Sequence, residues 1–122
     1  MTKGAALHEY FSSFGIPAYT STAVPDNAEF PYLTYDYVVG TWGYDEVAVT
    51  VNLWYRTDSE AIPNAKAEEI SKALGIGGKV ISCDEGFVWL KRGSPWCQSL
   101  ASESDASLKR RYINITADYL TE

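Results

Sequence analysis

The chain has few of the residues on which most catalytic and metal sites depend. Its 122 residues include one histidine, His8, and two cysteines, Cys83 and Cys97. No serine, cysteine or second metal ligand stands in a recognisable relation to His8, which argues against the common metal-binding spacings and nucleophile–histidine motifs. We expect His8 on the surface of a helix. The cysteines are predicted to be reduced and half-buried, the alternative being a bridge between adjacent strands in an oxidising compartment.

A surplus of positive charge is also missing. The chain has 10 lysines and arginines against 16 aspartates and glutamates, a formal net charge of −6. Proteins that bind nucleic acid directly neutralise its phosphates with a basic surface, so direct nucleic-acid binding is not expected. Two local exceptions, Lys91-Arg92 and Lys109-Arg110-Arg111, are predicted to be solvated charges at strand ends, with phosphate binding as the less favoured alternative.

Long apolar runs are absent too. No uninterrupted run approaches the length of a membrane-spanning helix. The first residues lead into His8 and Glu9 and lack the pattern of a secretory signal. We therefore expect a protein made and kept in a cytoplasm, without a membrane partner. The length corresponds to one domain, residues 1–122, and a hydrophobic content of 46% is enough for a core.

The stretch from Phe30 to Thr57 organises the predicted fold. β-Branched and aromatic residues dominate residues 30–39 and 45–56, with glycines between them, which predicts a long antiparallel hairpin. In the first strand, four residues match the core-facing phase: Leu33, Tyr35, Tyr37 and Val39. The second strand alternates strictly, with one set predicted to face the core: Val47, Val49, Val51, Leu53 and Tyr55.

Two helices and further strands complete the prediction. Apolar residues at helical spacing indicate a first helix, which Gly15 ends: Leu7, Tyr10, Phe11 and Phe14. A second helix follows Thr57 and Glu60, which have capping-box spacing, and ends near Gly75. Strands are predicted at 79–82, 87–91, 96–100 (a short edge strand) and 108–120, with an extended connector at 16–29 and a mobile loop at 101–107. The expected fold class is α+β, a two-layer sandwich with a mainly antiparallel sheet and both helices on one face.

The uncovered face of this sheet is predicted to be aromatic and neutral-polar. A face that meets only water would carry more lysine and glutamate, so this composition resembles protein–protein contact surfaces. The alternative is a solvent face that simply carries good strand formers. An aromatic pair at the hairpin tip favours contact. The residues predicted to contact another subunit are Trp42, Tyr44, Tyr32, Asn52, Trp54, Asn114 and Thr116.

An enzymatic alternative rests on two carboxylates of that face. Asp36 and Asp118 would form a glycosidase-like pair, or the centre of a small-ligand site, if the fold brought them together. Adjacent carboxylates elsewhere, such as Asp84 and Glu85, lie in predicted turns, where neighbouring side chains diverge.

Several short motifs in order resemble those of one family. They are Gly15-Ile16-Pro17-Ala18-Tyr19, Val24-Pro25-Asp26, Phe30-Pro31-Tyr32-Leu33-Thr34-Tyr35, Tyr55-Arg56-Thr57 before an Ala/Glu/Lys-rich helix, and Ile113-Asn114-Ile115-Thr116. In order and spacing, the chain resembles the small tail-terminator and minor structural proteins of long-tailed bacteriophages and prophages.

The resemblance implies a non-enzymatic α+β subunit, without cofactor or metal, in the virion after assembly in the bacterial cytoplasm. Such terminators form a ring, usually of six copies, on the end of the tail tube next to the head. The implied partners are further copies of the chain, tail-tube proteins and head-completion proteins. An alternative in the same assembly is a head-completion or adaptor component of the head–tail junction.

Overall fold

The computed structural model describes residues 1–36, 38–43, 45–102 and 104–122, and it shows an α+β fold with two helices and a six-stranded sheet. In chain order the elements are α1 (Lys3–Ser12), β1 (Ala18–Thr20), β2 (Tyr32–Tyr35), β3 (Val47–Arg56), α2 (Ala61–Leu74), β4 (Lys79–Cys83), β5 (Gly86–Ala101) and β6 (Leu108–Leu120). The predicted fold class is confirmed.

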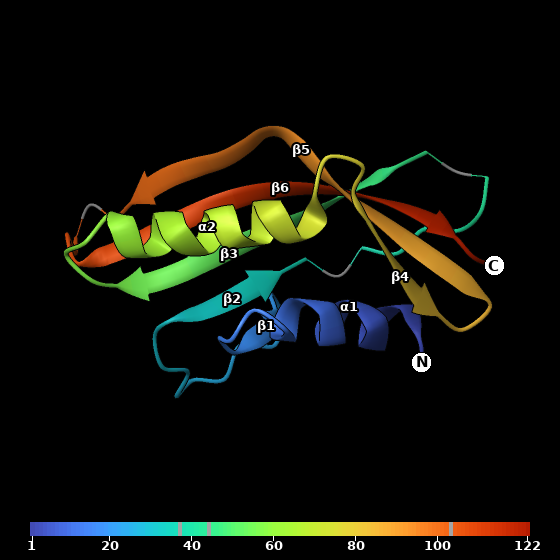
Figure 1. Ribbon diagram of the computed structural model, residues 1–122. Coiled ribbons are helices and arrows are strands. Elements are labelled where there is room, and N and C mark those ends of the chain that lie inside the picture. The colour runs from blue at the N-terminus through green and yellow to red at the C-terminus, as the bar shows by residue number, and fades with distance from the viewer. Residues whose placement is uncertain (37, 44, 103) are drawn as a thin grey trace.

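The sheet is mixed and strongly curled. Its strand order is β1-β2-β3-β6-β5-β4; β1 and β2 run parallel, and the other neighbours are antiparallel. α1 contacts both β1 and β4, the two opposite edges of the sheet, so the sheet curls around the core until one helix reaches both edges. Figure 1 shows α2 lying along the long strands β5 and β6, with α1 below them.

The core forms where the sequence predicts alternation. In β3 and β6 every second residue is buried: Val49, Val51, Leu53 and Tyr55, and Arg111, Ile113, Ile115, Ala117 and Tyr119. The helices bury their apolar stripes against these residues. α1 and the turn after it contribute Leu7, Phe11 and Phe14, and α2 contributes Ala67, Ile70 and Leu74. Gly15 and Gly75 follow the helices with φ of +83° and +73°, conformations that glycine adopts without strain.

The first arm of the predicted hairpin is shorter than expected. β2 ends at Tyr35, and after the bond from Asp36 N to Thr50 O (3.0 Å) the chain leaves β3. Residues 38–42 bond elsewhere: Trp42 N donates to Thr121 O at 2.7 Å, and Lys3 Nζ donates to Gly40 O at 3.0 Å. These partners, from the end of β6 and from α1, replace the β3 ladder. Val39, predicted to be in the core, is therefore 43% exposed, and Tyr37 and Tyr44 lie outside the described residues.

Residues 96–100 do not form a separate edge strand. They are the second half of β5, which continues through an irregularity between Arg92 and Cys97 and stays paired with β6. Gly93 makes this possible because a Cβ there would lie 2.8 Å from the Asn114 Cβ and 2.9 Å from its carbonyl oxygen. The edges of the sheet are instead β4 and the short strand β1, which lies within the predicted connector.

The predicted capping box of α2 is also wrong. Glu60 is the N-cap residue but makes no side-chain capping bond, and Thr57 Oγ1 accepts a bond from Ser59 N at 3.1 Å instead. The Glu60 carboxylate pairs with the Arg111 guanidinium at 2.6 Å. The bond to Arg111 joins two opposite charges, whereas a capping bond from the same carboxylate would reach only a neutral backbone N–H, which explains the choice.

Tyr10 of α1 has a buried hydroxyl group whose effect on stability can be tested. Its hydroxyl is a buried polar atom without a hydrogen-bond partner among the described residues, beside a cavity of about 340 Å³ between α1 and β4. Burial raises the pKa of Tyr10 from 10.0 to about 12. Tyr10→Phe is expected to stabilise the protein by about 1 kcal/mol in urea denaturation, since it removes an unpaired hydroxyl.

The same residue contributes to the pH dependence of stability. Because the folded pKa lies above the unfolded value, wild-type stability is retained below pH 10 and falls as the pH rises towards 12. Tyr10→Phe should lose less stability over this window; Tyr55, whose pKa burial also raises, accounts for part of the remainder. Tyr19→Phe on the opposite face is the control and should leave stability nearly unchanged. A Tyr10→Phe protein less stable than wild type would show that the hydroxyl has a partner.

Candidate functional site

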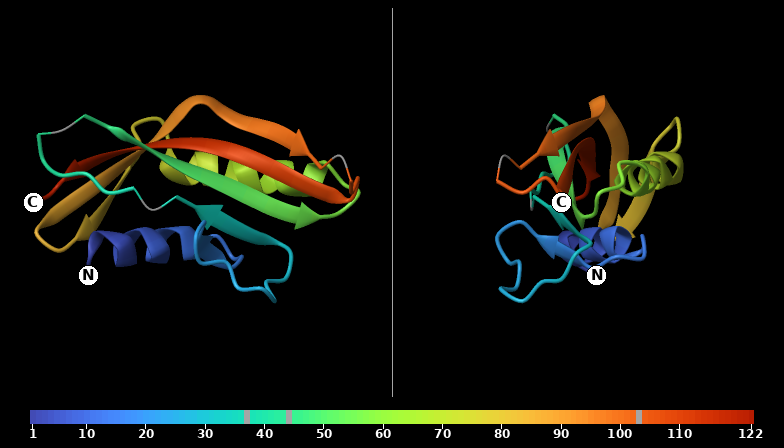
Figure 2. Two further views of the ribbon diagram at one scale, coloured as in Figure 1. Left: turned by 180° about the vertical axis from the view of Figure 1, so that it is seen from behind. Right: turned by 90° about the vertical axis from the view of Figure 1, so that its left-hand side faces the viewer.

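The face of the sheet opposite α2 carries a row of aromatic residues across four strands, β1, β2, β3 and β6. Figure 2 (left) views the molecule from this side, with β3 and β6 in front of α2. Tyr32 of β2 and Trp54 of β3 are directly paired, and Asn52 pairs with Tyr112 of β6. The structure therefore brings together three residues predicted to make subunit contacts: Tyr32, Asn52 and Trp54.

The rings of the row contact one another. Tyr32 lies at its centre, with ring centroids 6.3 Å from Trp54 at an interplanar angle of 23°. Phe30 lies 5.3 Å from Tyr32, and Tyr19 of β1 lies 5.9 Å from it in an edge-on arrangement. Aromatic pairs at these distances stabilise each other beyond the area they bury. Tyr19 and Phe30 were not among the residues predicted from the sequence to make subunit contacts.

Two arginines extend the row. Arg110 of β6 places its guanidinium 5.0 Å from the Trp54 ring and 5.8 Å from the Tyr112 ring, and its Nε donates to Asn52 Oδ1 at 2.7 Å. Arg56 lies 4.9 Å from the Phe30 ring. We call these residues together the aromatic row: Tyr19, Phe30, Tyr32, Trp54, Arg56, Arg110 and Tyr112. Arg110 was predicted to be an ordinary solvated charge. Its position two residues before Tyr112 in a strand puts both on the same face of the sheet, and this spacing could have identified it from the sequence.

Hydrogen bonds hold the aromatic row in position. Trp54 Nε1 donates to Thr34 Oγ1 at 3.0 Å, and Thr34 is only 5% exposed. The Arg110–Asn52 bond fixes the next residue in the same way. A surface whose side chains are already ordered loses little conformational entropy on binding, so the aromatic row is suited to recognition.

The other predicted contact residues lie apart from the aromatic row. Asn114 Nδ2 donates to Pro95 O at 2.8 Å and so secures the irregularity in β5. Thr116 bonds to Glu46, whose carboxylate also pairs with Lys91 at 2.9 Å; these bonds, Lys91 first, lower the pKa of Glu46. Trp42 is 68% exposed on the connection between β2 and β3, and Tyr44 is not among the described residues.

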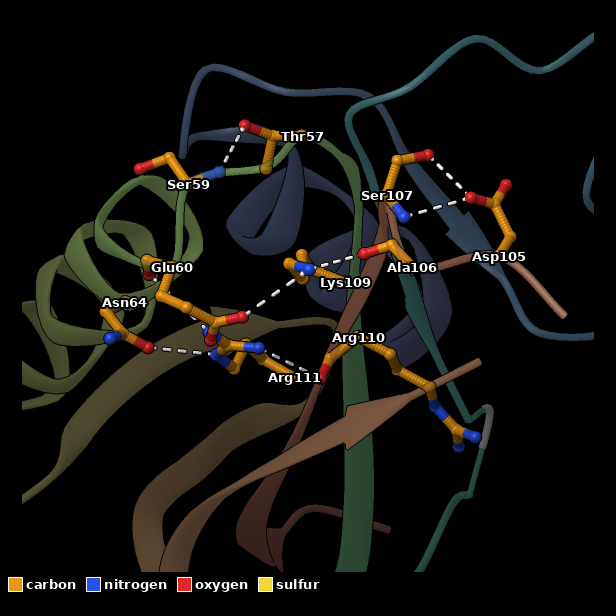
Figure 3. Close-up of polar contacts among 10 residues, drawn as sticks. All are labelled: Thr57, Ser59, Glu60, Asn64, Asp105, Ala106, Ser107, Lys109, Arg110 and Arg111. Carbon is orange, nitrogen blue, oxygen red and sulfur yellow. Dashed lines mark hydrogen bonds and ion pairs between the residues drawn. The ribbon is translucent and has the colours of Figure 1, made fainter. Parts of the chain in front are cut away.

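A second polar cluster lies at the junction of β6 with α2. Arg111 is 1% exposed, and its guanidinium bonds to Glu60 Oε2 at 2.6 Å and Asn64 Oδ1 at 2.9 Å. Lys109 Nζ lies 3.7 Å from the other Glu60 oxygen. Figure 3 shows these groups converging on Glu60, while the Arg110 side chain points away from them. The cluster fastens α2 to the sheet, and Arg110 is left to the opposite face.

The carboxylates of the enzymatic alternative are far apart. Asp36 N bonds to Thr50 O, and Thr50 is paired with Asn114. Asp118 is four positions further along β6, which corresponds to about 13 Å at the rise of a strand. The carboxylates of glycosidases are about 5–9.5 Å apart. Asp36 also accepts a bond from Ser21 Oγ at 2.9 Å, and the sheet register places the two residues further apart than a glycosidase pair.

Two other kinds of feature are absent from the described residues, a cluster of metal ligands and a membrane-spanning helix. Within residues 1–36, 38–43, 45–102 and 104–122, no three histidine, cysteine or acidic side chains lie close enough together to hold a metal ion. No helix in the same ranges has the length and apolar character needed to cross a membrane.

The cysteines are both free and half-buried. Burial raises the pKa of Cys97, although nearby Arg111 acts in the opposite direction.

Comparison of the chain with protein-family models, with curated proteins and with solved structures finds no match.

Proposed function

We propose that this chain is a structural subunit of a long-tailed bacteriophage or prophage, a tail terminator or tail-completion protein that assembles into a ring at the end of the tail next to the head. The observation that carries the proposal is the ordered aromatic row on the sheet face opposite α2, seven residues of which two are arginines stacked on rings. The motif order of the sequence supports the same family. Tyrosine, tryptophan and arginine are the residue types most enriched where proteins bind one another.

The charge of the chain is compatible with this role. A net charge of −6 gives a ring an acidic character, and an acidic channel does not retain DNA that has to pass through it. On this proposal the partners are further copies of the chain, the tail-tube protein and head-completion proteins, and the protein acts in the virion after assembly in the host cytoplasm.

Light scattering after size-exclusion chromatography tests the proposal. The protein is measured over a range of concentrations, alone and with tail tubes from the phage or prophage whose genome encodes it. We expect concentration-dependent oligomers and, by electron microscopy, rings on tube ends. A protein that remains monomeric and binds no tube would overturn the proposal. Binding to head particles instead would favour the head-completion alternative.

Substitutions in the aromatic row connect the result to the site. Tyr32→Ala combined with Trp54→Ala should abolish assembly while the far-ultraviolet circular dichroism spectrum stays unchanged. The control is Ile76→Ser: Ile76 is 99% exposed in the turn between α2 and β4, and its loss should leave assembly intact. Equal loss in both variants would show that the effect does not depend on the aromatic row.

A further inference from the structure

Two features at opposite ends of the molecule complement each other. We propose that Trp42 of one copy inserts into a pocket beside Arg110 of a second copy, and that Asp45 of the first copy pairs with that arginine. This contact rests on the proposed function, because it supplies the step by which one subunit joins the next. We call residues 38–43 and 45–46 the arm, and we call the receiving cavity the Arg110 pocket.

The Arg110 pocket suits one side chain. Its volume is about 220 Å³, below the roughly 300 Å³ at which sites for drug-sized ligands begin. Apolar groups from β3, β5 and β6 form most of the lining, with one cation at the margin: Trp54, Leu100, Ala101, Ser102, Leu108 and Arg110. A cavity with this lining favours an aromatic or aliphatic side chain that has a carboxylate nearby.

Arg110 is the cation in this region that lacks an acidic partner. Arg56 pairs with Asp105, and Lys109 and Arg111 both pair with Glu60. Within the described part of the chain, Arg110 has no carboxylate within ion-pair distance; its Nε bonds to a neutral amide, that of Asn52. The two terminal nitrogens of its guanidinium therefore remain available for a carboxylate from outside, and Figure 3 shows the side chain extended away from the paired groups.

The arm carries the matching groups. Trp42 is 68% exposed, compared with 50% for Phe87. Asp45 is exposed and, among the residues that the structure describes, has no lysine or arginine within ion-pair distance, whereas its neighbour Glu46 is paired with Lys91. A tryptophan and an unpaired aspartate three positions apart thus match a pocket and an unpaired arginine.

The arm is held in place before any partner arrives. Trp42 N donates to Thr121 O at 2.7 Å, and Lys3 Nζ donates to Gly40 O at 3.0 Å. Gly43 then turns the chain with a φ of +89°, which a side chain at that position would disfavour. An anchored aromatic group costs less entropy to bury than a flexible one, and buried tryptophans are typical centres of binding energy.

The positions of the two features make a second copy the occupant. β6 begins and ends at opposite ends of the sheet (Figure 1). The arm bonds to Thr121, just after the end of β6, whereas Leu108 and Arg110 at its start line the Arg110 pocket. A chain therefore cannot fill its own pocket. The contact is heterologous, since two different surfaces meet, and repeating it adds copies in one direction until the ring closes.

Complementation between two variants tests this contact. Trp42→Ala removes the side chain that the arm inserts and leaves the Arg110 pocket intact. Arg110→Glu replaces the cation of the pocket by an acid that repels Asp45 and leaves the arm intact. Each variant alone is expected to self-associate about 30-fold more weakly than wild type, the effect of losing about 2 kcal/mol. Mixed one to one, they retain one working arm and one working pocket, so they should form a heterodimer that does not grow. Sedimentation velocity distinguishes these states.

Two further measurements distinguish loss of the contact from misfolding of a variant. The double variant Asp45→Arg with Arg110→Asp reverses the ion pair and should recover self-association, which neither single substitution permits. A variant with benzoylphenylalanine in place of Trp42, otherwise unchanged, should crosslink on illumination to residues 100–108 of another chain. Crosslinks elsewhere, or no restoration in the mixture, would overturn the inference.

The outcome separates this inference from the proposed function. If Trp42→Ala assembles as well as wild type while the Tyr32/Trp54 variant does not, the arm contact is wrong and the ring proposal survives. If wild type stays monomeric at every concentration, with and without tail tubes, both fail. If a small molecule co-purifies in the Arg110 pocket and blocks the crosslink, the pocket is a ligand site and the inference fails.

Discussion

Glu60→Ala is expected to destabilise the protein by about 2 to 3 kcal/mol in urea denaturation. The Glu60 carboxylate pairs with a guanidinium that is 1% exposed, so its removal leaves a buried charge without its acidic partner. Breaking a fully buried pair costs about 3–5 kcal/mol, and the expected loss is smaller because the Glu60 side chain is itself 61% exposed.

Two further variants identify the cause. Glu69→Ala removes a surface ion pair with Lys66 (3.1 Å) on the same helix and should cost less than about 0.5 kcal/mol. Replacing Arg111 by Met in the Glu60→Ala background removes the stranded charge and should recover about half of the lost stability. Equal costs for Glu60→Ala and Glu69→Ala would mean that Arg111 does not depend on the carboxylate.

Gly86→Ala is expected to cost about 3 kcal/mol or more. Gly86 begins β5, and a Cβ there would lie 2.1 Å from the carbonyl oxygen of Leu120 and 3.1 Å from Thr121 Cα. Both are backbone atoms, one in the last residue of β6 and one in the residue after it, so relief requires the β5–β6 pair to separate locally rather than a side chain to rotate.

A matched glycine shows what the clash contributes. Gly77, in the turn before β4, has no atom within 4 Å of an added Cβ, so Gly77→Ala should change stability by about 0.5 kcal/mol or less. Thermal unfolding of both variants makes the comparison. If the Gly86→Ala and Gly77→Ala proteins unfolded at the same temperature, β5 and β6 would be able to separate at this point without a cost in stability.

The parts of the fold that sequence reasoning predicted are those decided by local pattern. β6 matches the predicted range of 108–120, and the buried set of β3 matches its alternation. Both strands have one buried and one open face, so the period of two is visible in the residues themselves. Leu7 and Phe11 marked the buried stripe of α1 for the equivalent reason.

The failures occurred where distant groups compete with local preference. Residues 36–39 read as a strand, but the backbone at Gly40 and Trp42 bonds to α1 and to Thr121, just after β6, and not to β3. Glu60 read as half of a capping box, but Arg111, distant in sequence, takes its carboxylate. Neither competitor is visible within a window of neighbouring residues.

The candidate site was predicted in part for the same reason. The residues of the open face followed from alternation, which grouped Tyr32, Asn52 and Trp54. The stacking of Arg110 on Trp54 depends on the register between β3 and β6, which pairs the two residues directly. Register is fixed by the whole sheet, and so the arginine looked like one of three similar charges in a basic run.

The position of β6 has a consequence for folding of the protein during its synthesis on the ribosome. β6 follows β5 in the chain yet lies between β3 and β5. A nascent polypeptide emerged only as far as residue 101 therefore has two strands whose common neighbour does not yet exist, and their backbone amides and carbonyls stay open to other chains. The sheet is completed only when residues 108–120 have left the exit tunnel and β6 pairs with β3 and β5, which were synthesised earlier.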